Sequence, residues 1–494
     1  MTSDFTPFEA TIADIHSAYA AGTLTCSGLV GYYLDRIEAY DKSGPQINAI
    51  TTVSPSVREE AAALDKAYAE SGPVGPLHGV PVLMKDQVDT VGMPTTLGST
   101  LFKDFYPDND GVLTTKLKDA GALIIAKTTL GEFAAGDTHG SLFGSTRNPY
   151  DPERTVGGSS GGSGASVNAN FGLVAIGQEE FASIRRPAAW NGVVGMRPTL
   201  GLVSRSGAYR PWPSRNGSLG PMTRTVEDAA RVLDAVAGYD PEDPSTAAGV
   251  GQLTGSWVGA LDPGALHGAR IGIIRESIGG GSEPGTVDFE NVATVFSKAV
   301  AELAEAGAEI VDPIVVPDLK ELLAKRWQDA GATSFENWMG RNANPPFTRY
   351  EDFAETDEFK EANFRRDRGR PRNRTASKGE YELARQELMT NLLVVMADED
   401  LDAIVHVTVE HTATFIRDFV NPPHVNTKGV PHLNTFLIEV PSITVPAGYS
   451  PEGQPVGITF LGRPFSDREM VSLAYSYEQA TKHRVPPAFT PDTV

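Results

Sequence analysis

Basic residues and cysteine are both scarce in this sequence of 494 residues, and each shortage excludes a class of protein. Lys and Arg number 42 against 63 Asp and Glu, which gives a formal net charge of −21. That charge repels nucleic acid and anionic membrane surfaces, so we expect neither as a partner. The single cysteine, Cys26, cannot form a disulfide within the chain or build a cysteine-ligated zinc site.

Long apolar runs and a secretory leader are missing as well. No stretch approaches the ~18 apolar residues needed to cross a bilayer. Residues 1–22 lack a basic segment followed by an apolar one, so no secretory signal is expected. We therefore expect a cytoplasmic protein, and the 40% hydrophobic and 21% charged residues are typical of a globular chain with a large core.

Strand patterns and helix patterns alternate along most of the chain. Short apolar runs bounded by Gly or Asp, typical of buried strands, lie at residues 79–86, 122–128 and 172–177. Apolar residues from 289 to 303 recur at the spacing of an amphipathic helix. The alternation predicts an α/β fold: one large domain, residues 1–494, with a mixed, mostly parallel twisted sheet covered by helices on both faces.

Two helix starts carry capping signals. Thr11 precedes a helical pattern that begins at Ile12, as an N-cap residue does. Ser466 stands three residues before Glu469, the spacing of a capping box, and predicts the start of the last helix.

Two segments stand apart from the alternating pattern. Residues 1–70 predict a helical layer at the N-terminus. Residues 340–378 are rich in Arg, Pro and Asn and have little apolar periodicity. They predict an irregular excursion near the entrance of a site, which is either a lid or a solvated surface loop.

Residues 157–164 consist only of glycine and serine, and three explanations compete for them. A phosphate-binding P-loop needs a lysine after its last glycine, and none is present. A flexible linker would separate two compositions, but a helix and strand pattern follows at once. The remaining explanation is a loop that opens a helix, whose free N–H groups can hold an anion or a developing oxyanion.

The same stretch also fits the G-x-S-x-G pattern of a nucleophile elbow, through Ser159 and through Ser160. That pattern needs a strand directly before the serine and a histidine downstream. The preceding segment reads as a loop, and His406, His411 and His432 have no context that marks one as catalytic. The histidines do not form a metal motif either, so we expect no metal and no cofactor.

Lys85 ends the apolar run at residues 79–86, which is an unusual place for a lysine. An isolated buried ammonium is costly, so such a group tends to lose its proton. A neutral lysine can then activate a serine without any histidine. The alternative is that Lys85 extends to a surface carboxylate such as Asp86, and that Ser183, further along, is an ordinary loop serine.

Taken together, these stretches closely resemble the amidase signature family of serine amidohydrolases. The resemblance covers nearly the whole chain, in order and at the expected spacings. The segments that carry it are LHGVPVLMKD, GALIIAKTTLGEFAAG, FGSTRNPYDPERTVGGSSGGSGAS, SIRRPAAWNGVVGMRPTLGLVS, GSLGPMTRTVEDAARVLDAVAG, VPSITVPAG and PVGITFLG.

The resemblance implies a Ser-Ser-Lys triad. Ser183 matches the nucleophile that attacks the carbonyl carbon and carries the acyl group. Ser159 matches the bridging serine, which follows a cis peptide bond in the family, and Lys85 matches the general base. Ser160 and Arg185 match positions that support the site by hydrogen bonding.

One segment departs from the family pattern G-[ST]-D-x-G-G-S, because this chain reads GQEEFAS. Glu179 stands where aspartate is usual, and Phe181 and Ala182 replace two glycines. Carried over by position, the backbone N–H groups of Glu180, Phe181, Ala182 and Ser183 form the oxyanion hole. Without glycine's access to positive φ, either the loop is not left-handed or it is strained. The Phe181 ring either walls the acyl pocket or packs in the core.

The resemblance implies hydrolysis of the C–N bond of a small or medium-sized amide by a stand-alone monomer or homodimer. Carbamate or ester hydrolysis in the same family is an alternative. Another is a glutamine-hydrolysing component of a glutamyl-tRNA amidotransferase, its A-type subunit, which works with partner proteins. We also expect Phe133 to contact the substrate. A non-catalytic binding protein is disfavoured because Lys85, Ser159 and Ser183 are all present.

Overall fold

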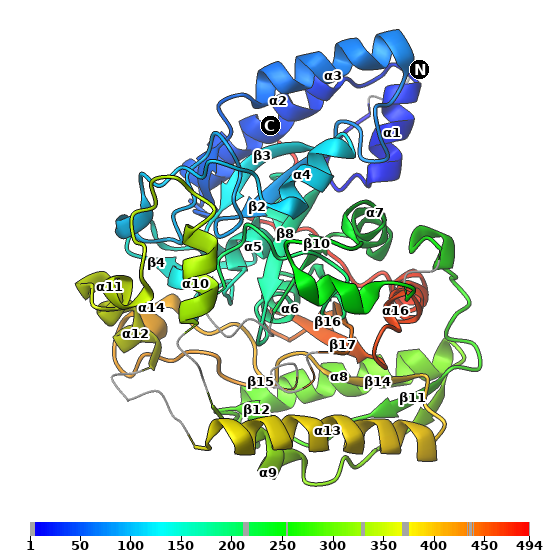
Figure 1. Cartoon of the computed structure of the whole chain (residues 1–494). Helices are drawn as coiled ribbons and strands as arrows, with labels where there is room; N and C mark the ends of the chain where they lie inside the picture. Colours follow the sequence, from blue (N-terminus) through cyan, green and yellow to red (C-terminus); the bar gives the residue numbers. More distant parts are fainter. Residues whose placement is uncertain are drawn as a thin grey trace.

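A large mixed sheet forms the centre of the molecule (Figure 1). The computed structural model describes residues 5–210, 217–252, 255–327, 331–367, 375–431, 433, 437 and 439–493. Within these residues the sheet has 11 strands. In spatial order they are β1 (Ile50–Val53), β3 (Leu123–Thr128), β2 (Pro81–Lys85), β8 (Val174–Glu179), β10 (Ser218–Thr223), β9 (Val194–Arg197), β16 (Ser442–Tyr449), β17 (Pro455–Leu461), β14 (Ala403–Val407), β11 (Arg270–Ile273) and β13 (Glu309–Val311).

Parallel pairing occurs in two groups of strands. β3, β2 and β8 are parallel neighbours, and so are β14, β11 and β13, whereas the strands between the two groups pair antiparallel. Every residue of β2 and β8 is buried, which is why both read as nearly unbroken apolar runs. Their carboxyl ends lie side by side, so Lys85 and Glu179 reach the same edge of the sheet.

Helices cover the sheet on both faces, which confirms the predicted α/β architecture (Figure 1). One series packs in succession along one face: α4 (Val112–Asp119), α7 (Val226–Val236), α16 (Asp467–Thr481) and α8 (Val287–Glu305). The other helices include α5 (Gly161–Asn168), α6 (Arg185–Trp190), α9 (Leu319–Leu323), α13 (Lys378–Asp398) and α14 (Ile416–Val420). Short strand pairs lie outside the main sheet: β4 (His139–Gly140) with β5 (Gly144–Ser145), β6 (Arg147–Asn148) with β7 (Asp151–Thr155), and β12 (Gly279–Gly280) with β15 (Val430–Pro431).

The N-terminal helices α1 (Ile12–Ala20), α2 (Cys26–Arg36) and α3 (Val57–Ser71) lie at the end of the sheet formed by β1 and β3 (Figure 1). At the end of α2, the guanidinium of Arg36 is fully buried. It donates to the carbonyl oxygens of Ala169 and Asn170, and to those of Thr490 and Pro491. The first helices and the last residues of the chain are thereby tied to the same core.

The two capping predictions had different outcomes. Thr11 and Asp14 form a full capping box at α1, which confirms the first. α16 begins at Asp467, directly after Ser466, so the predicted helix start is confirmed. The capping box itself is wrong, because the Ser466 hydroxyl donates to the Arg463 carbonyl (2.8 Å) and accepts from no helix amide. With φ −84° and ψ 28°, Ser466 lacks the extended backbone that turns an N-cap side chain onto the helix amides.

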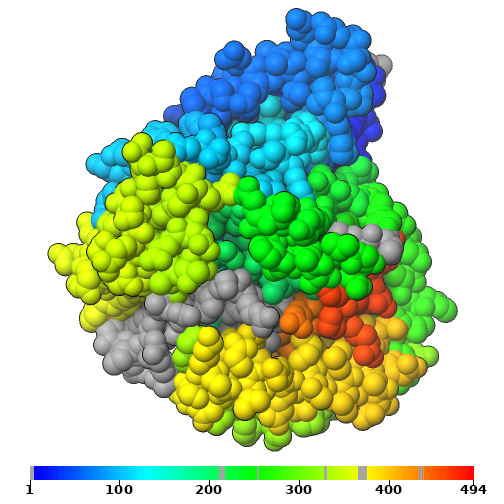
Figure 2. All heavy atoms as spheres, in the orientation of Figure 1, coloured from blue at the N-terminus to red at the C-terminus, as the bar shows by residue number. Residues whose placement is uncertain are grey.

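Residues 332–367 form short helices outside the sheet: α10 (Ala332–Met339), α11 (Tyr350–Ala354) and α12 (Asp357–Asp367). They make a lobe on one side of the molecule, yellow-green in Figure 2. The irregular structure predicted for residues 340–378 is therefore wrong for α11 and α12, and residues 368–374 lie outside the described part. An aromatic cluster holds the lobe to the main body, and its rings are Phe102, Phe105, Phe133, Tyr209, Phe335, Trp338, Tyr350, Phe353 and Phe359. Helices this short depend on such packing and are too brief to show periodicity.

Candidate active site

Lys85 is the last residue of β2 and is fully buried (0% exposed). Its Nζ lies 2.8 Å from Ser159 Oγ and 3.4 Å from the carbonyl oxygen of Gln178. Burial lowers the pKa of Lys85 well below its ordinary value, and the carboxyl groups of Glu180 and Glu179 offset only part of that shift. An amine in this state can accept the proton of the Ser159 hydroxyl.

The alternative partner for Lys85 is already paired. Asp86 contacts Lys127, with Oδ1 and Nζ 3.1 Å apart and both side chains fully buried. Lys127 is held further by Thr95 Oγ1 and the Pro94 carbonyl. The interpretation in which Lys85 extends to Asp86 is therefore wrong.

The glycine and serine stretch is buried along its whole length, which excludes a flexible linker. The peptide bond between Gly158 and Ser159 is cis, as the resemblance implied. Glycine is required here by close approach: a Cβ on Gly158 would lie 2.2 Å from the Gly136 carbonyl oxygen, and one on Gly162 2.3 Å from that of Thr129. The loop then opens α5 at Gly161.

Ser183 lies just before α6 and is partly exposed. The amide of Ser160 donates to the carbonyl of Ser183 (3.1 Å), which places Ser183 beside the Ser159 loop. Within the described residues, no hydrogen bond joins the hydroxyls of Ser183 and Ser159. The structure thus brings Lys85 and Ser159 into direct contact, and it links Ser183 to them through the backbone.

Glu179 fixes the turn that carries Ser183. Its Oε2 accepts from the amides of Ile184 and Arg185 (2.9 Å each), and its Oε1 accepts from Arg185 Nε (2.8 Å). Arg185 in turn donates to the Phe181 carbonyl (3.0 Å). Burial would raise the pKa of Glu179, but Arg185 and Arg197 outweigh it and hold that pKa below its ordinary value. The Glu179 carboxylate therefore fixes the turn between the end of β8 and the start of α6.

The departure at Phe181 and Ala182 fits this turn without left-handed backbone. Neither residue has a positive φ, so side chains are tolerated where the family has glycine. The methyl of Ala182 packs in an apolar cluster with Val409 and Val430. In the described part of the chain, the amides of Ala182 and Ser183 donate to no other residue, so both are available to a developing oxyanion.

Glu180, the next residue after β8, is a buried acid that the sequence did not identify as unusual. Its side chain is 3% exposed, and neither carboxyl oxygen has a hydrogen-bond partner among the described residues. Burial raises the pKa of Glu180 well above its ordinary value, against the attraction of Arg210, Arg205 and Lys85. A buried carboxyl group with a raised pKa therefore lies close to Lys85.

Arg186 and Asp137 were missed by the sequence analysis, although both contact the Ser159 loop or its support. The Arg186 guanidinium donates to the carbonyl of Gly158, and its Nη1 lies 2.6 Å from Asp137 Oδ1. The available signal was the second arginine of SIRRPAAW, in a helix whose residues are all buried.

Phe133, the residue expected to contact the substrate, lies in the aromatic cluster. It is 2% exposed, and its ring packs against those of Phe353 and Phe359, with centroids 5.1 and 5.3 Å away. The lobe of α10–α12, which the sequence did not reveal as helical, covers this ring, and the contact of Phe133 with the substrate stays a prediction.

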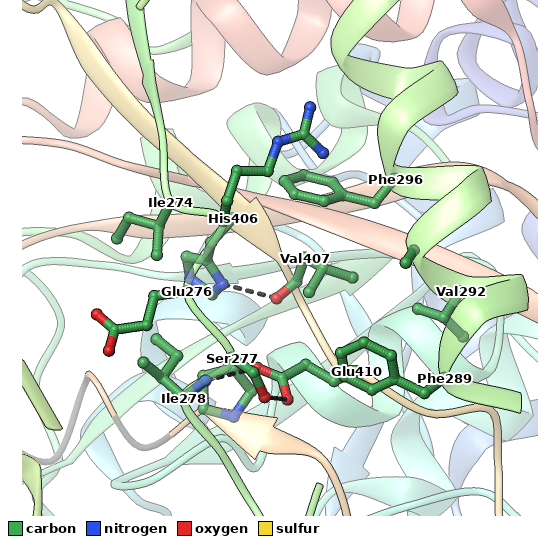
Figure 3. Close-up of a pocket in the computed structure, with 13 residues that line it drawn as sticks. Ile274, Glu276, Ser277, Ile278, Phe289, Val292, Phe296, His406, Val407 and Glu410 are labelled. Carbon is green, nitrogen blue, oxygen red and sulfur yellow. Dashed lines mark hydrogen bonds between the residues drawn. The ribbon is translucent and has the colours of Figure 1, made fainter. Parts of the chain in front are cut away.

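His406 lines a separate cavity of about 100 Å³ (Figure 3). Burial lowers the pKa of His406 to about 3, so the ring is neutral, and its Nδ1 lies 2.7 Å from the Val407 carbonyl. The residues described around the cavity include none of Lys85, Ser159 and Ser183.

The other histidines give no sign of catalysis or metal binding. His411 pairs with Asp288 (2.7 Å), and its Nε2 accepts from the Glu283 amide; His432 lies outside the described residues. Over the described ranges, no cluster of three or more His, Cys, Asp or Glu side chains is arranged to hold a metal. No helix in the same ranges is long and apolar enough to cross a membrane.

Comparison with known proteins agrees with this geometry. The family model described as Amidase matches residues 28–471. The A-type subunit of the glutamyl-tRNA(Gln) amidotransferase from Exiguobacterium sp. is 35% identical over 96% of this chain and 98% of its own. The corresponding protein of Heliobacterium modesticaldum is 33% identical over 95% and 96%. The crystal structure of peptide amidase from Stenotrophomonas maltophilia superposes with a TM-score of 0.84 at 32% identity, over 98% of this chain and 100% of its own.

The chain belongs to the Amidase family. Family membership and the structural match support the hydrolysis of an amide C–N bond by this enzyme.

Proposed function

We propose that this enzyme cleaves a small or medium-sized amide through an acyl-enzyme on Ser183. Ser183 Oγ attacks the carbonyl carbon while its proton passes to Ser159, and the Ser159 proton passes to Lys85. The amides of Ala182 and Ser183 hold the oxyanion. The proton then returns through Ser159 to the leaving amine, and water hydrolyses the ester by the same route.

The contact between Lys85 and Ser159 carries the proposal. Lys85 is fully buried, its pKa is lowered, and its Nζ lies 2.8 Å from the Ser159 hydroxyl. It can therefore act as a general base that takes the proton directly from Ser159. The link from Ser160 to the Ser183 carbonyl supports the other half of the path. Glu179, Arg185 and Ser160 act as supports for the loop.

A second candidate is a glutaminase that works as one component of a larger complex. It is supported by the 35% identity to the Exiguobacterium amidotransferase protein, which extends over nearly the whole of both chains. In that case glutamine is the amide, and a partner receives the ammonia. The peptide amidase similarity supports the stand-alone alternative, in which a peptide amide is the substrate.

Product release from a mixed panel separates these candidates. The panel holds C-terminal peptide amides, anilides, carbamates, esters and glutamine, with wild type and Ser183→Ala side by side. Glutamine is also tested together with the other components of an amidotransferase. Cleavage of peptide amides by the chain alone supports the stand-alone enzyme, and glutamine cleavage that needs the added components supports the complex. Equal cleavage by Ser183→Ala contradicts both.

A further inference from the structure

We propose that Arg186 is a positioning residue that fixes the Ser159 loop for catalysis; this inference rests on the proposed function. The Nε and Nη2 of Arg186 both donate to the carbonyl oxygen of Gly158, at 3.2 and 2.8 Å. That carbonyl belongs to the peptide group directly before Ser159. Holding it with two donors therefore limits the rotation of the backbone that presents Ser159 Oγ to Lys85.

Arg186 lies in the first turn of α6, shortly after Ser183, and its own amide donates to the Ala182 carbonyl (2.9 Å). The helix that follows the nucleophile thus carries the side chain that holds the bridging serine. One residue couples the Ser183 turn to the Ser159 loop. A change in the position of either segment would move the two hydroxyls relative to each other.

Residues 136–138 support the same loop from the other side. Arg186 Nη2 also donates to the Gly136 carbonyl (3.2 Å). The amide and hydroxyl of Thr138 donate to the Gly157 carbonyl, at 2.9 and 2.8 Å, and the Gly161 amide donates to the Thr138 hydroxyl. The Ser159 loop is therefore held between α6 and this segment.

Asp137 supplies the counter-charge for Arg186. Both side chains are 2% exposed, and Nη1 lies 2.6 Å from Oδ1 without the alignment of a hydrogen bond. Burial lowers the pKa of Arg186 and raises that of Asp137, and each charge offsets part of the shift of the other. Among the described residues no hydrogen bond joins this carboxylate to Ser159, so the pair contributes charge balance, whereas the donors on the Gly158 carbonyl set the geometry.

These two roles can be separated by mutation. Asp137→Asn removes the counter-charge but leaves both donors on the Gly158 carbonyl. The double variant Arg186→Gln with Asp137→Asn removes both charges together, which avoids a lone buried charge, but it loses the paired donors. Arg186→Lys keeps the charge and cannot form the planar fork.

The test measures kcat, KM and Tm for wild type and these variants on an amide that wild type cleaves, and the rate at which a fluorophosphonate labels Ser183. We expect the double variant to lose roughly ten- to hundredfold in kcat and in labelling rate, with KM within about twofold. Asp137→Asn is expected to keep kcat within about twofold while its Tm falls. Compared with the double variant, Arg186→Lys is expected to recover more of the wild-type Tm than of the wild-type kcat.

The matched control is another ion pair with paired contacts, Arg484 and Glu9, whose Nη2 and Oε1 are 2.7 Å apart. The variant Glu9→Gln with Arg484→Gln should lower Tm and leave kcat unchanged. The inference is overturned if the Arg186 double variant keeps wild-type kcat. It is also overturned if Asp137→Asn alone loses as much kcat as the double variant loses. Failure of the proposed function looks different: wild type is then not labelled, or Ser183→Ala cleaves as fast as wild type.

Discussion

At the scale of single residues, the site is built around charges that the fold holds out of water. Lys85, Glu180 and Arg186 are all buried, and within the residues that the structure describes only Arg186 of the three has an ion-pair partner. Removing an ionisable group from water is costly unless it is paired or neutral. Lys85 and Glu180 meet this condition by shifting towards their neutral forms, and the neutral form of Lys85 is the one that can act as a base.

Lys85→Met is expected to abolish activity and to stabilise the fold. Turnover should fall by about a thousandfold or more, because the base is lost. The free energy of unfolding at pH 7 should rise by about 1 kcal/mol, as is typical when a buried functional group is replaced. The folded pKa of Lys85 is lowered, so its penalty is largest at low pH and declines as pH rises towards the unfolded value. Denaturant titration of wild type and variant at pH 6 and pH 9 checks this. A variant less stable than wild type at both pH values would contradict it.

Glu179→Gln is expected to destabilise the enzyme by about 3–5 kcal/mol, because Arg185 stays buried without its partner. The folded pKa of Glu179 is lowered from 4.5, so its contribution is present above that pH and is lost as pH falls through the folded value. Wild-type stability should therefore decline more steeply with acid than that of the variant. Unfolding curves between pH 3 and pH 7 measure both slopes, and parallel slopes would rule out the role given to Glu179.

At the scale of elements, strands were predicted better than helices. The apolar runs at 79–86 and 122–128 correspond to β2 and β3 within two residues. The run at 172–177 also lies within two residues of β8, but it stops early, because β8 extends through polar Gln178 and Glu179, which are buried by tertiary contacts. Helices α11 and α12 were missed since their stability comes from rings contributed by distant segments.

The aromatic cluster gives a prediction for the lobe of α10–α12. Phe353 is fully buried and its ring stacks on that of Phe335, with centroids 4.8 Å apart. Phe353→Ala should cost about 3–5 kcal/mol. In this variant, amide hydrogen exchange should be faster in α11 and α12 than in β2 and β8. Leu383→Ala, at an exposed position on α13, is the control. Uniform exchange across all four elements would show that the lobe is not a separate packing unit.

At the scale of the whole molecule, we propose that residues 1–494 form one domain. β9 pairs with β16, which joins the central strands to the C-terminal part of the same sheet. Arg36 ties α2 to residues 490 and 491, and the hydroxyl of Tyr32 donates to Asp492. The N-terminal helix α2 and residues 490–492 are therefore packed together.

This proposal predicts that a chain ending at residue 485 unfolds in one transition at a lower Tm than wild type. Arg36 would lose the carbonyl acceptors of Thr490 and Pro491, and with them two hydrogen bonds of its guanidinium. Far-ultraviolet circular dichroism and tryptophan fluorescence should give coincident curves for both chains. Two separated transitions would indicate independent domains.

The candidate site shows where sequence reasoning reaches its limit. Lys85, Ser159 and Ser183 were found because motifs fix their spacing along the chain, and the structure places them together. The partnership of Arg186 with Asp137 and the covering of Phe133 depend on segments far apart in sequence, which no local pattern reports.

The most direct test of the account is mass spectrometry of enzyme quenched within milliseconds of mixing with a cleaved amide. We expect a mass increase equal to the acyl group, located on the peptide that contains Ser183, and no increase in Ser183→Ala. Lys85→Ala should slow its formation by about a thousandfold or more. An acyl group on another residue, or full turnover by Ser183→Ala, would contradict the account.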